Sequence, residues 1–578
     1  MSSQTSVGSS PDTTDLVRTP HLALFETGGN QAYVFGTNRL RENLGASELL
    51  SQSCTTWVSE AAAHLVDCRV ITATSGRALV WCKDDDQACK LVGDVTMRAL
   101  VDAPGLVLAA AHVEWDPSND LGEQVRALIQ QCEQAAGATA TGAARFLRLP
   151  IVAPCESTGL PAERSVRIGG GHEATARLLS EVAWAKLCAS SDARKRLKLE
   201  LDLQPPADIE ELETMIRRRR DVGWLAVIHA DGNGIGNSFI SLDGWVREET
   251  LDMAAAERAQ KYLAVYTEFS QALEDATTTA LREAVKKVRD CLRDDERAAA
   301  SNAVSATQGS GQPHPPEDGN DETLPILPLV VGGDDVAVII DARYALDFTE
   351  TLLNTFASDS KPAEVLLQHL PGAQIPPHFT MGAGVAIVKP HFPFHAAYEL
   401  AEQLADVAKA AAKEELAAHE VPGEVGVPAG SLDFHMLSDS TGTTLDEIRA
   451  SRRSDDGQVA LWGGPYLVGV SSDTSKGGTL RDLHQFRQAL ALVATNEDDQ
   501  PTVSRSSINK VRVALFDTEG AAATANDYLD RPLPEELFDW RDSGPSGKPQ
   551  RSTILIDVVD VADLWSMAPS DRATGGGA

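Results

Sequence analysis

The chain has 578 residues, which is too long for one hydrophobic core and predicts a protein of several domains. Its formal net charge of -33 means that the surface as a whole repels the phosphates of nucleic acid. We therefore expect little direct nucleic-acid binding from this chain alone. No apolar stretch is long enough to span a bilayer and the polar start lacks a signal-peptide pattern, so we expect a cytoplasmic protein without membrane contact.

The first predicted domain covers residues 19–140 and follows a disordered tail at 1–18. Its apolar patterns predict a strand, a helix, a hairpin, a helix and a strand, at 21–27, 38–66, 68–82, 85–102 and 105–115. This is the element order of a ferredoxin-like unit. The tip of its hairpin carries Ser75, Gly76 and Arg77.

A connector domain is predicted at 141–215, with a helical run at 173–189. The eight cysteines of the chain all lie within its first 291 residues, and no two of them are spaced as CxxC. The sequence therefore predicts neither a disulfide framework nor a zinc ribbon.

The second predicted domain, 216–430, repeats the element order of the first. Its strands and helices are expected at 223–231, 248–290, 326–331, 336–340, 342–357, 378–389 and 393–419. A segment rich in Ser, Gly, Pro and acids at about 295–323 is expected to be a disordered insertion. The repeated order indicates a divergent internal duplication.

The remainder of the chain, 431–566, is expected to be a separate, mostly helical C-terminal domain, followed by a disordered tail at 567–578. The predicted fold class is therefore α+β. It consists of two ferredoxin-like domains, a helical connector and the C-terminal domain.

Three carboxylates are expected to meet in the second domain. In a split βαβ arrangement the first two strands run the same way on either side of the third, so Asp231 at the end of the first strand converges with Asp334 and Asp335 at the hairpin tip. Crowded carboxylates repel one another unless cations neutralise them, and they suit two Mg2+ or Mn2+ ions bound with nucleotide phosphates. The alternative is a solvated turn without metal, and His229 is interpreted as a packed strand histidine.

The loop "DGNGIGN" follows the first strand of the second domain. Its glycines have the spacing GxGxG, whereas a dinucleotide-binding turn has GxGxxG, and we expect no helix to open directly behind it. The loop is therefore not predicted to bind a dinucleotide.

Several motifs together resemble one protein family. "HADGNGIG", "VVGGDDVAVII", "FTMGAGVAIVKPHFPFHAAYELAEQLADVAK" and "GGPYLV" are similar to successive motifs of the large palm-polymerase subunit of type III CRISPR complexes. "GNQAYVFGTNRLRENLGASELLSQ" resembles the first, catalytically inactive palm of that family. The resemblance covers roughly residues 20–565.

The resemblance implies an enzyme that joins ATP through 3'-5' linkages into cyclic oligoadenylate, a second messenger of antiviral defence. It implies that Asp231, Asp334 and Asp335 hold two divalent cations and that Lys409 meets the triphosphate. It also implies a set of nucleotide-binding residues at the two turns, namely Gly232, Asn233, Gly234, Gly236, Gly332 and Gly333. Its expected partners are ATP and other type III subunits with guide RNA and target RNA.

The chain departs from the family pattern at three places. Asn233 and Gly234 stand where many relatives carry a second acid, so metal affinity or base preference is expected to differ. Thr158 replaces a cysteine three residues after Cys155, so we expect no zinc there. No His-Asp dipeptide occurs, so no HD nuclease and no DNA cleavage are expected.

Two other functions stay open. One is a non-catalytic scaffold subunit of a CRISPR ribonucleoprotein complex, and the other is a stand-alone cyclic dinucleotide synthase. A scaffold is expected to have lost Asp334 or Asp335, and this chain retains both.

Overall fold

The protein is represented by a computed structural model. It describes residues 19–138, 146, 148–168, 175–217, 223–306, 323–418, 425–437, 444–469, 480–493, 503–542 and 551–565. Both tails predicted from the sequence, 1–18 and 567–578, lie outside these residues. Among the described helices, none combines the length and apolar character that crossing a membrane requires.

The first domain contains a four-stranded antiparallel sheet with the order β2-β3-β1-β4. Its strands are β1 (His21–Gly28), β2 (Cys68–Thr74), β3 (Arg77–Cys82) and β4 (Val107–Glu114). Its helices are α1 (Asn30–Val34), α2 (Leu40–Cys54), α3 (Thr56–Ala63), α4 (Asp85–Asp102) and α5 (Leu121–Ala138). The ferredoxin-like fold predicted for this domain is confirmed. The single helix expected at 38–66 is wrong, because this segment forms two helices, α2 and α3, that meet at Thr55.

The connector contains a two-stranded sheet and two helices: β5 (Arg164–Ile168), β6 (Thr175–Leu179), α6 (Glu181–Leu201) and α7 (Ile209–Arg217). The helix predicted at 173–189 is therefore wrong in its first part. Ser180 explains where α6 begins, because its hydroxyl accepts a hydrogen bond from Ala183 N and caps the helix. The preceding residues pair with β5 instead.

The second domain repeats the strand order of the first as β10-β7-β9-β8. Its strands are β7 (Leu225–Gly232), β8 (Ile326–Gly332), β9 (Asp335–Asp341) and β10 (Met381–Val388). Its helices are α8 (Ile235–Glu249), α9 (Ala255–Ala306), α10 (Ala345–Ser358), α11 (Lys361–His369) and α12 (Phe394–Ala418). Strands β7 and β8 both run antiparallel to β9, so they point the same way on either side of it.

Two expectations for this domain are wrong. Helix α8 opens at Ile235, directly behind the glycine loop, because Gly234 adopts a positive φ of 72° and turns the chain into the helix. Helix α9 continues to Ala306, so the start of the expected insertion, 295–306, is helical. Its Ala-rich sequence favours this continuation. Residues 307–322 lie outside the described part of the chain.

The boundary predicted between 430 and 431 is also wrong, because it cuts a strand. β11 (Gly430–Met436) runs parallel to β10, and β13 (Tyr466–Val468) and β14 (Arg481–Asp482) extend the same sheet to seven strands. Helix α12 crosses from β10 to β11, which makes a βαβ unit. All eight residues of β10 are buried, as is usual for a central strand.

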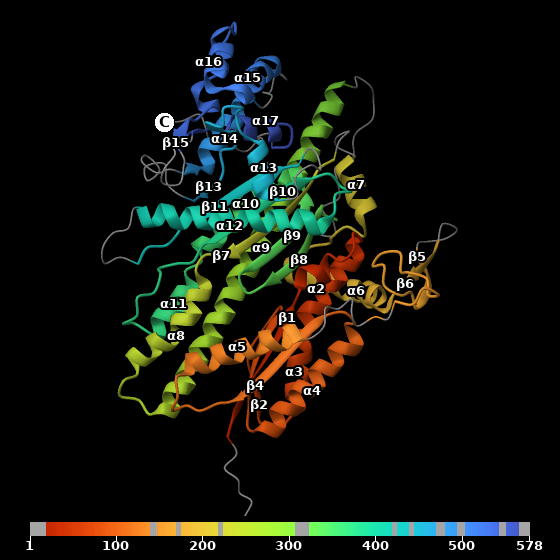
Figure 1. The fold of residues 1–578 in the computed structure, drawn as a ribbon, viewed down its shortest axis with the longest axis vertical. Helices are drawn as coiled ribbons and strands as arrows, with labels where there is room; N and C mark the ends of the chain where they lie inside the picture. Colours follow the sequence, from red (N-terminus) through yellow and green to blue (C-terminus); the bar gives the residue numbers. More distant parts are fainter. Residues whose placement is uncertain are drawn as a thin grey trace, which may run out of the picture.

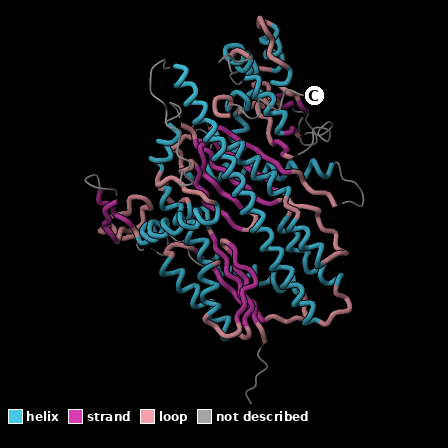
Figure 2. The backbone as a smooth tube through the Cα atoms, turned by 180° about the vertical axis from the view of Figure 1, so that it is seen from behind, coloured by secondary structure: helices cyan, strands magenta, loops and turns pink. Residues whose placement is uncertain are grey.

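Most of the C-terminal helices gather beyond this edge of the second sheet and are drawn in blue in Figure 1, while α13 (Leu445–Ser451) is cyan and packs on α12. The others are α14 (Leu483–Val493), α15 (Arg505–Asp517), α16 (Glu519–Asp527) and α17 (Leu555–Val561), with a small sheet of β12 (Val459–Ala460), β15 (Arg541–Asp542) and β16 (Arg551–Ser552). Figures 1 and 2 show the two large sheets one after the other along the long axis of the molecule, each flanked by helices.

Candidate functional site

The strand pairing brings the three aspartates to one edge of the second sheet. Ala230 pairs with Val336 on β9, so Asp231 and Asp335 lie one step further along the same two strands. Gly333 adopts a positive φ of 60° at the hairpin tip, and Thr277 of α9 donates a hydrogen bond of 2.6 Å to its carbonyl. This hydrogen bond fixes the hairpin that carries Asp334 and Asp335 to helix α9.

Lys409 also reaches this edge. Its ammonium forms an ion pair with Oδ2 of Asp231, and its side chain is only 16% exposed. To reach β7 from α12 it passes over β10, where a Cβ on Gly382 would overlap Cγ of Lys409. The absence of a side chain at Gly382 is what opens this path.

Among the described residues, no lysine or arginine forms such an ion pair with Asp334 or Asp335. Enclosure by the surrounding protein, followed by the negative charge of Asp231, raises the pKa of both carboxyls above their usual range. Oδ1 of Asp335 is enclosed and has no hydrogen-bond partner among the described residues, although 41% of the side chain reaches solvent. Two carboxylates without a Lys or Arg partner in the described part of the chain, close to a third carboxylate, are a suitable donor set for hard divalent cations.

Two residues beneath the aspartates were not predicted as part of the site. The buried His229 has its Nδ1 3.3 Å from Oδ1 of Asp335, and the hydroxyl of Tyr398 lies 3.2 Å from the same Nδ1. Burial lowers the pKa of His229, which favours the neutral imidazole. Tyr398 and Lys409 are eleven residues apart on α12, a spacing that puts them on one helix face and could have identified Tyr398.

A third residue of α12 that the sequence reasoning missed is Glu402. Its negative charge acts to raise the pKa of Asp335. Its Oε1 accepts a hydrogen bond of 2.9 Å from the side-chain amide of Gln31 in α1. This bond joins the first domain to the helix that carries Lys409.

The residues predicted to bind nucleotide are placed in different ways. A Cβ on Gly232 would lie 2.5 Å from Oδ2 of Asp334, so this glycine makes room for the carboxylate. A Cβ on Gly332 would lie 2.5 Å from Cβ of Ser75, so this glycine admits the hairpin tip of the first domain. Gly234, Gly236 and Gly333 have open space around them.

Asn233 is buried and serves the loop itself. Its side-chain amide donates a hydrogen bond of 2.9 Å to Oγ1 of Thr380, and its backbone N–H donates one of 2.8 Å to the carbonyl of the same residue. It anchors the glycine loop to the start of β10, and its contact with nucleotide stays a prediction.

The hairpin tip of the first domain carries the opposite charge pattern. Arg77 pairs in register with Glu26 and forms an ion pair with it. These two positions correspond to Asp335 and Asp231 in the second domain. A cation in place of the hairpin acid leaves no set of carboxylates for metal ions.

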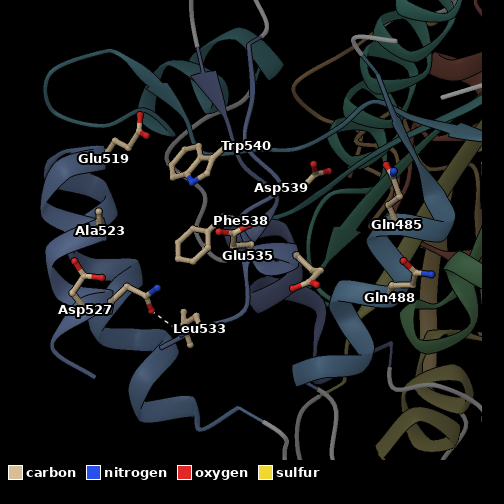
Figure 3. A pocket seen from close by; sticks show the side chains of 12 residues that line it. Gln485, Gln488, Glu519, Ala523, Asp527, Leu533, Glu535, Phe538, Asp539 and Trp540 are labelled. Carbon is tan, nitrogen blue, oxygen red and sulfur yellow. Dashed lines mark hydrogen bonds between the residues drawn. The ribbon is translucent and has the colours of Figure 1, made fainter. Parts of the chain in front are cut away.

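A separate cavity of about 650 Å³ lies in the C-terminal region (Figure 3). Phe538 and Trp540 stack on one side of it at 5.9 Å between ring centroids, and acidic side chains surround them, including Glu519, Asp527 and Asp539. These carboxylates repel phosphates, so the cavity does not suit a nucleotide triphosphate.

Comparison with known proteins identifies the domain that holds the three aspartates. Residues 224–417 match the family model described as "Cas10/Cmr2, second palm domain". This segment is a Cas10/Cmr2 second palm domain. The resemblance to the large palm subunit of type III CRISPR complexes is thereby confirmed. The other ferredoxin-like domain has the same strand order and is called the first palm below. No curated protein matches the chain.

Solved structures similar to this chain include Csm1-Csm4 cassettes. One in complex with AMPPNP is 12% identical with a TM-score of 0.45 and covers 94% of this chain and 69% of its own. One in complex with cA3 has 12% identity, a TM-score of 0.45 and coverage of 96% and 71%. One in complex with cA4 has 13% identity, a TM-score of 0.35 and coverage of 71% and 54%, so this chain spans about half of that one.

Proposed function

We propose that this chain is a nucleotidyltransferase that makes cyclic oligoadenylate from ATP. The observation that supports this most is the arrangement of Asp231, Asp334 and Asp335 at one edge of a Cas10/Cmr2 second palm. In this proposal the three aspartates hold two Mg2+ or Mn2+ ions. The ions, when bound, lower the pKa of the attacking 3'-hydroxyl and stabilise the leaving pyrophosphate.

The residues of the chain bind and orient the substrate. Lys409 is already paired with Asp231, and its ammonium is free to turn to the triphosphate once a cation takes over that carboxylate. The open space at Gly234, Gly236 and Gly333 lets the nucleotide approach the backbone. His229 and Tyr398 support Asp335 from below.

The first palm serves as the second wall of the site in this proposal. Its hairpin tip reaches the second palm at the contact between Ser75 and Gly332. The acceptor nucleotide would lie between the two palms, and other type III CRISPR subunits with guide RNA and target RNA would be partners of the chain.

The test is to incubate the purified full chain with each NTP and Mg2+ or Mn2+, with and without RNA, and to identify products by mass spectrometry. The double variant Asp334→Ala, Asp335→Ala is expected to give no cyclic product. Glu248→Ala, Glu249→Ala removes two adjacent exposed acids at the end of α8 and is expected to behave as the unmodified chain.

Other outcomes decide between the alternatives. Identical product spectra from the chain and its Asp334, Asp335 variant under all conditions would overturn the enzyme and favour the scaffold. A cyclic dinucleotide formed without RNA would favour the stand-alone synthase.

A further inference from the structure

A group of side chains with metal-binding chemistry lies in the first palm, away from the proposed catalytic edge. His21 is on β1 and His112 is on β4, and these strands pair so that Ala23 is opposite His112 and Glu114 is opposite His21. The two histidines are therefore diagonal neighbours on the same face of the sheet. Asp85 and Cys89 lie one turn apart in the first turns of α4, which packs against this sheet.

Two of the three distances within the group match those around one small cation, and the third is slightly longer. Nδ1 of His21 and Nδ1 of His112 are 3.3 Å apart. Oδ1 of Asp85 is 3.8 Å from the first of these nitrogens and 3.6 Å from the second. A tetrahedral zinc ion with bonds of about 2.0–2.2 Å places its ligand atoms about 3.3–3.6 Å apart. Within the described part of the chain, this is the one group of three or more His, Cys, Asp or Glu side chains whose ligand atoms are so close together.

The protonation of the two rings also suits a cation. Two Nδ1 atoms that face each other cannot both carry a proton without a clash. Sγ of Cys89 is 3.4 Å from Nε2 of His112, where it can accept the ring N–H and leave Nδ1 with a free lone pair. Metal-binding histidines usually donate their other N–H to such an outer partner.

We propose that His21 Nδ1, His112 Nδ1 and Asp85 Oδ1 form a zinc-class metal site in which Cys89 fixes the orientation of His112. Two imidazole nitrogens favour zinc and its neighbours over Mg2+, which prefers oxygen ligands. A water molecule would complete a tetrahedral shell. The ion would join the start of α4 to β1 and β4 and so brace the first palm.

This site is separate from the three aspartates. The first palm meets the hairpin of the second at its own hairpin tip, which lies at the Glu26 end of β1. His21 is at the other end of β1, five residues or about 17 Å away along the strand. The site is also separate from the segment around Cys155 and Thr158, which lies in the connector.

The experiment is a Co2+ titration of the full chain after removal of metal by a chelator, followed by absorption spectroscopy. Co2+ stands in for zinc and reports a tetrahedral site. All proteins carry Asp334→Ala and Asp335→Ala, so that the proposed catalytic carboxylates do not contribute. We expect one equivalent of Co2+ to bind with tetrahedral bands, and Zn2+ to displace it while Mg2+ in excess does not.

Four variants are compared in this background, three within the proposed site and one control. His112→Ala and Asp85→Ala are each expected to lose the tetrahedral bands. Asp85 is 64% exposed, so its variant keeps the fold even if His112→Ala does not. Cys89→Ser is expected to weaken binding by about 10- to 100-fold. His64→Ala, at an exposed histidine whose Nδ1 lies 2.7 Å from the carbonyl of Glu60, is the matched control and should bind as the parent does.

The proposal is overturned if the parent shows no saturable Co2+ uptake, or if Asp85→Ala binds Co2+ as the parent does. Intense thiolate-to-cobalt bands that disappear in Cys89→Ser would overturn the position given to Cys89, because they would make its sulfur a direct ligand. A rise in Tm with Zn2+ in the parent, absent in Asp85→Ala, supports the bracing role.

Discussion

The two palms neutralise the acid at the end of their first strand in different ways. In the first palm Glu26 is paired with Arg77 from its own hairpin. In the second palm Asp231 is paired with Lys409 from α12, the helix between β10 and β11, and the hairpin position opposite Asp231 holds Asp335. The same strand order therefore carries a closed ion pair in one palm and a cluster of carboxylates in the other.

This difference explains why the hairpin edge of the second palm, and not that of the first, is the candidate for two-metal catalysis. An arginine in the hairpin is always charged and cannot leave its partner without exposing a lone carboxylate. A lysine on a flexible stem, reaching across Gly382, can exchange its carboxylate for phosphate, and no lysine or arginine that the structure describes pairs with the hairpin aspartates.

The largest expected effect comes from giving the second palm the charge pattern of the first. Asp335→Arg should pair with Asp231 as Arg77 does with Glu26, so we expect a folded protein that makes no cyclic product. Mass spectrometry of products from ATP, beside a circular dichroism spectrum, checks both expectations. Glu249→Arg makes the same charge change at an exposed position and should leave the product unchanged. Product formation by Asp335→Arg at the normal rate would remove Asp335 from the proposed site.

The meeting of the three aspartates was accessible from the sequence because it depends only on strand order. Once two strands flank a third and point the same way, the end of β7 and the tip between β8 and β9 share an edge. The roles given to these residues, and the domain boundaries other than the one at 430, stay predictions. The strand order itself is confirmed.

The extension of the sheet was not accessible in the same way. In β11 the apolar residues Leu432 and Phe434 alternate with Ser431, Asp433 and His435, which is also the pattern of a surface strand or loop. Asp433 is nevertheless buried, because Arg449 forms an ion pair with it. Such a long-range partner cannot be derived from local periodicity. The alternation of strand, helix and strand from β10 to β11 was the signal that could have predicted the pairing.

Lys409 has a counterpart near the first palm that is enclosed without a paired carboxylate. Lys186 of α6 is 2% exposed, donates a hydrogen bond to the carbonyl of Tyr33 and lies 4.2 Å from the centroid of that ring. Burial lowers its pKa to about 8, although the negative charge of Glu42 acts in the other direction. Lys409 is thus held by a carboxylate, whereas Lys186 is held by a backbone carbonyl and an aromatic ring.

The next effect in size is a pH dependence of stability from Lys186. Its pKa is lower in the folded chain than in the unfolded one, so between about pH 8 and 10.5 the unfolded chain binds more protons and stability rises with pH. The full gain is about 3 kcal/mol. Urea denaturation of the chain and of Lys186→Met at pH 7, 8, 9 and 10 measures it. The stability of the chain relative to the variant should increase over this range.

A difference between the two proteins that stays constant with pH would contradict the lowered pKa of Lys186. Comparing them at each pH removes the contribution of other groups that titrate in the same range, because both proteins share those groups.

The smallest effect tests the path by which Lys409 reaches Asp231. In Gly382→Ala the added Cβ overlaps Cγ of Lys409, so the lysine or the helix must shift, at a cost of about 1–3 kcal/mol in the free energy of unfolding. Product formation should fall as well, because the ammonium no longer lies at the aspartates. Gly244→Ala, inside α8 where a Cβ meets nothing within 4 Å, is the matched control and should stabilise the chain by about 1 kcal/mol. If Gly382→Ala kept both its stability and its product, Lys409 would have no need of this passage, and the contrast drawn between the two palms would rest on the hairpin charges alone.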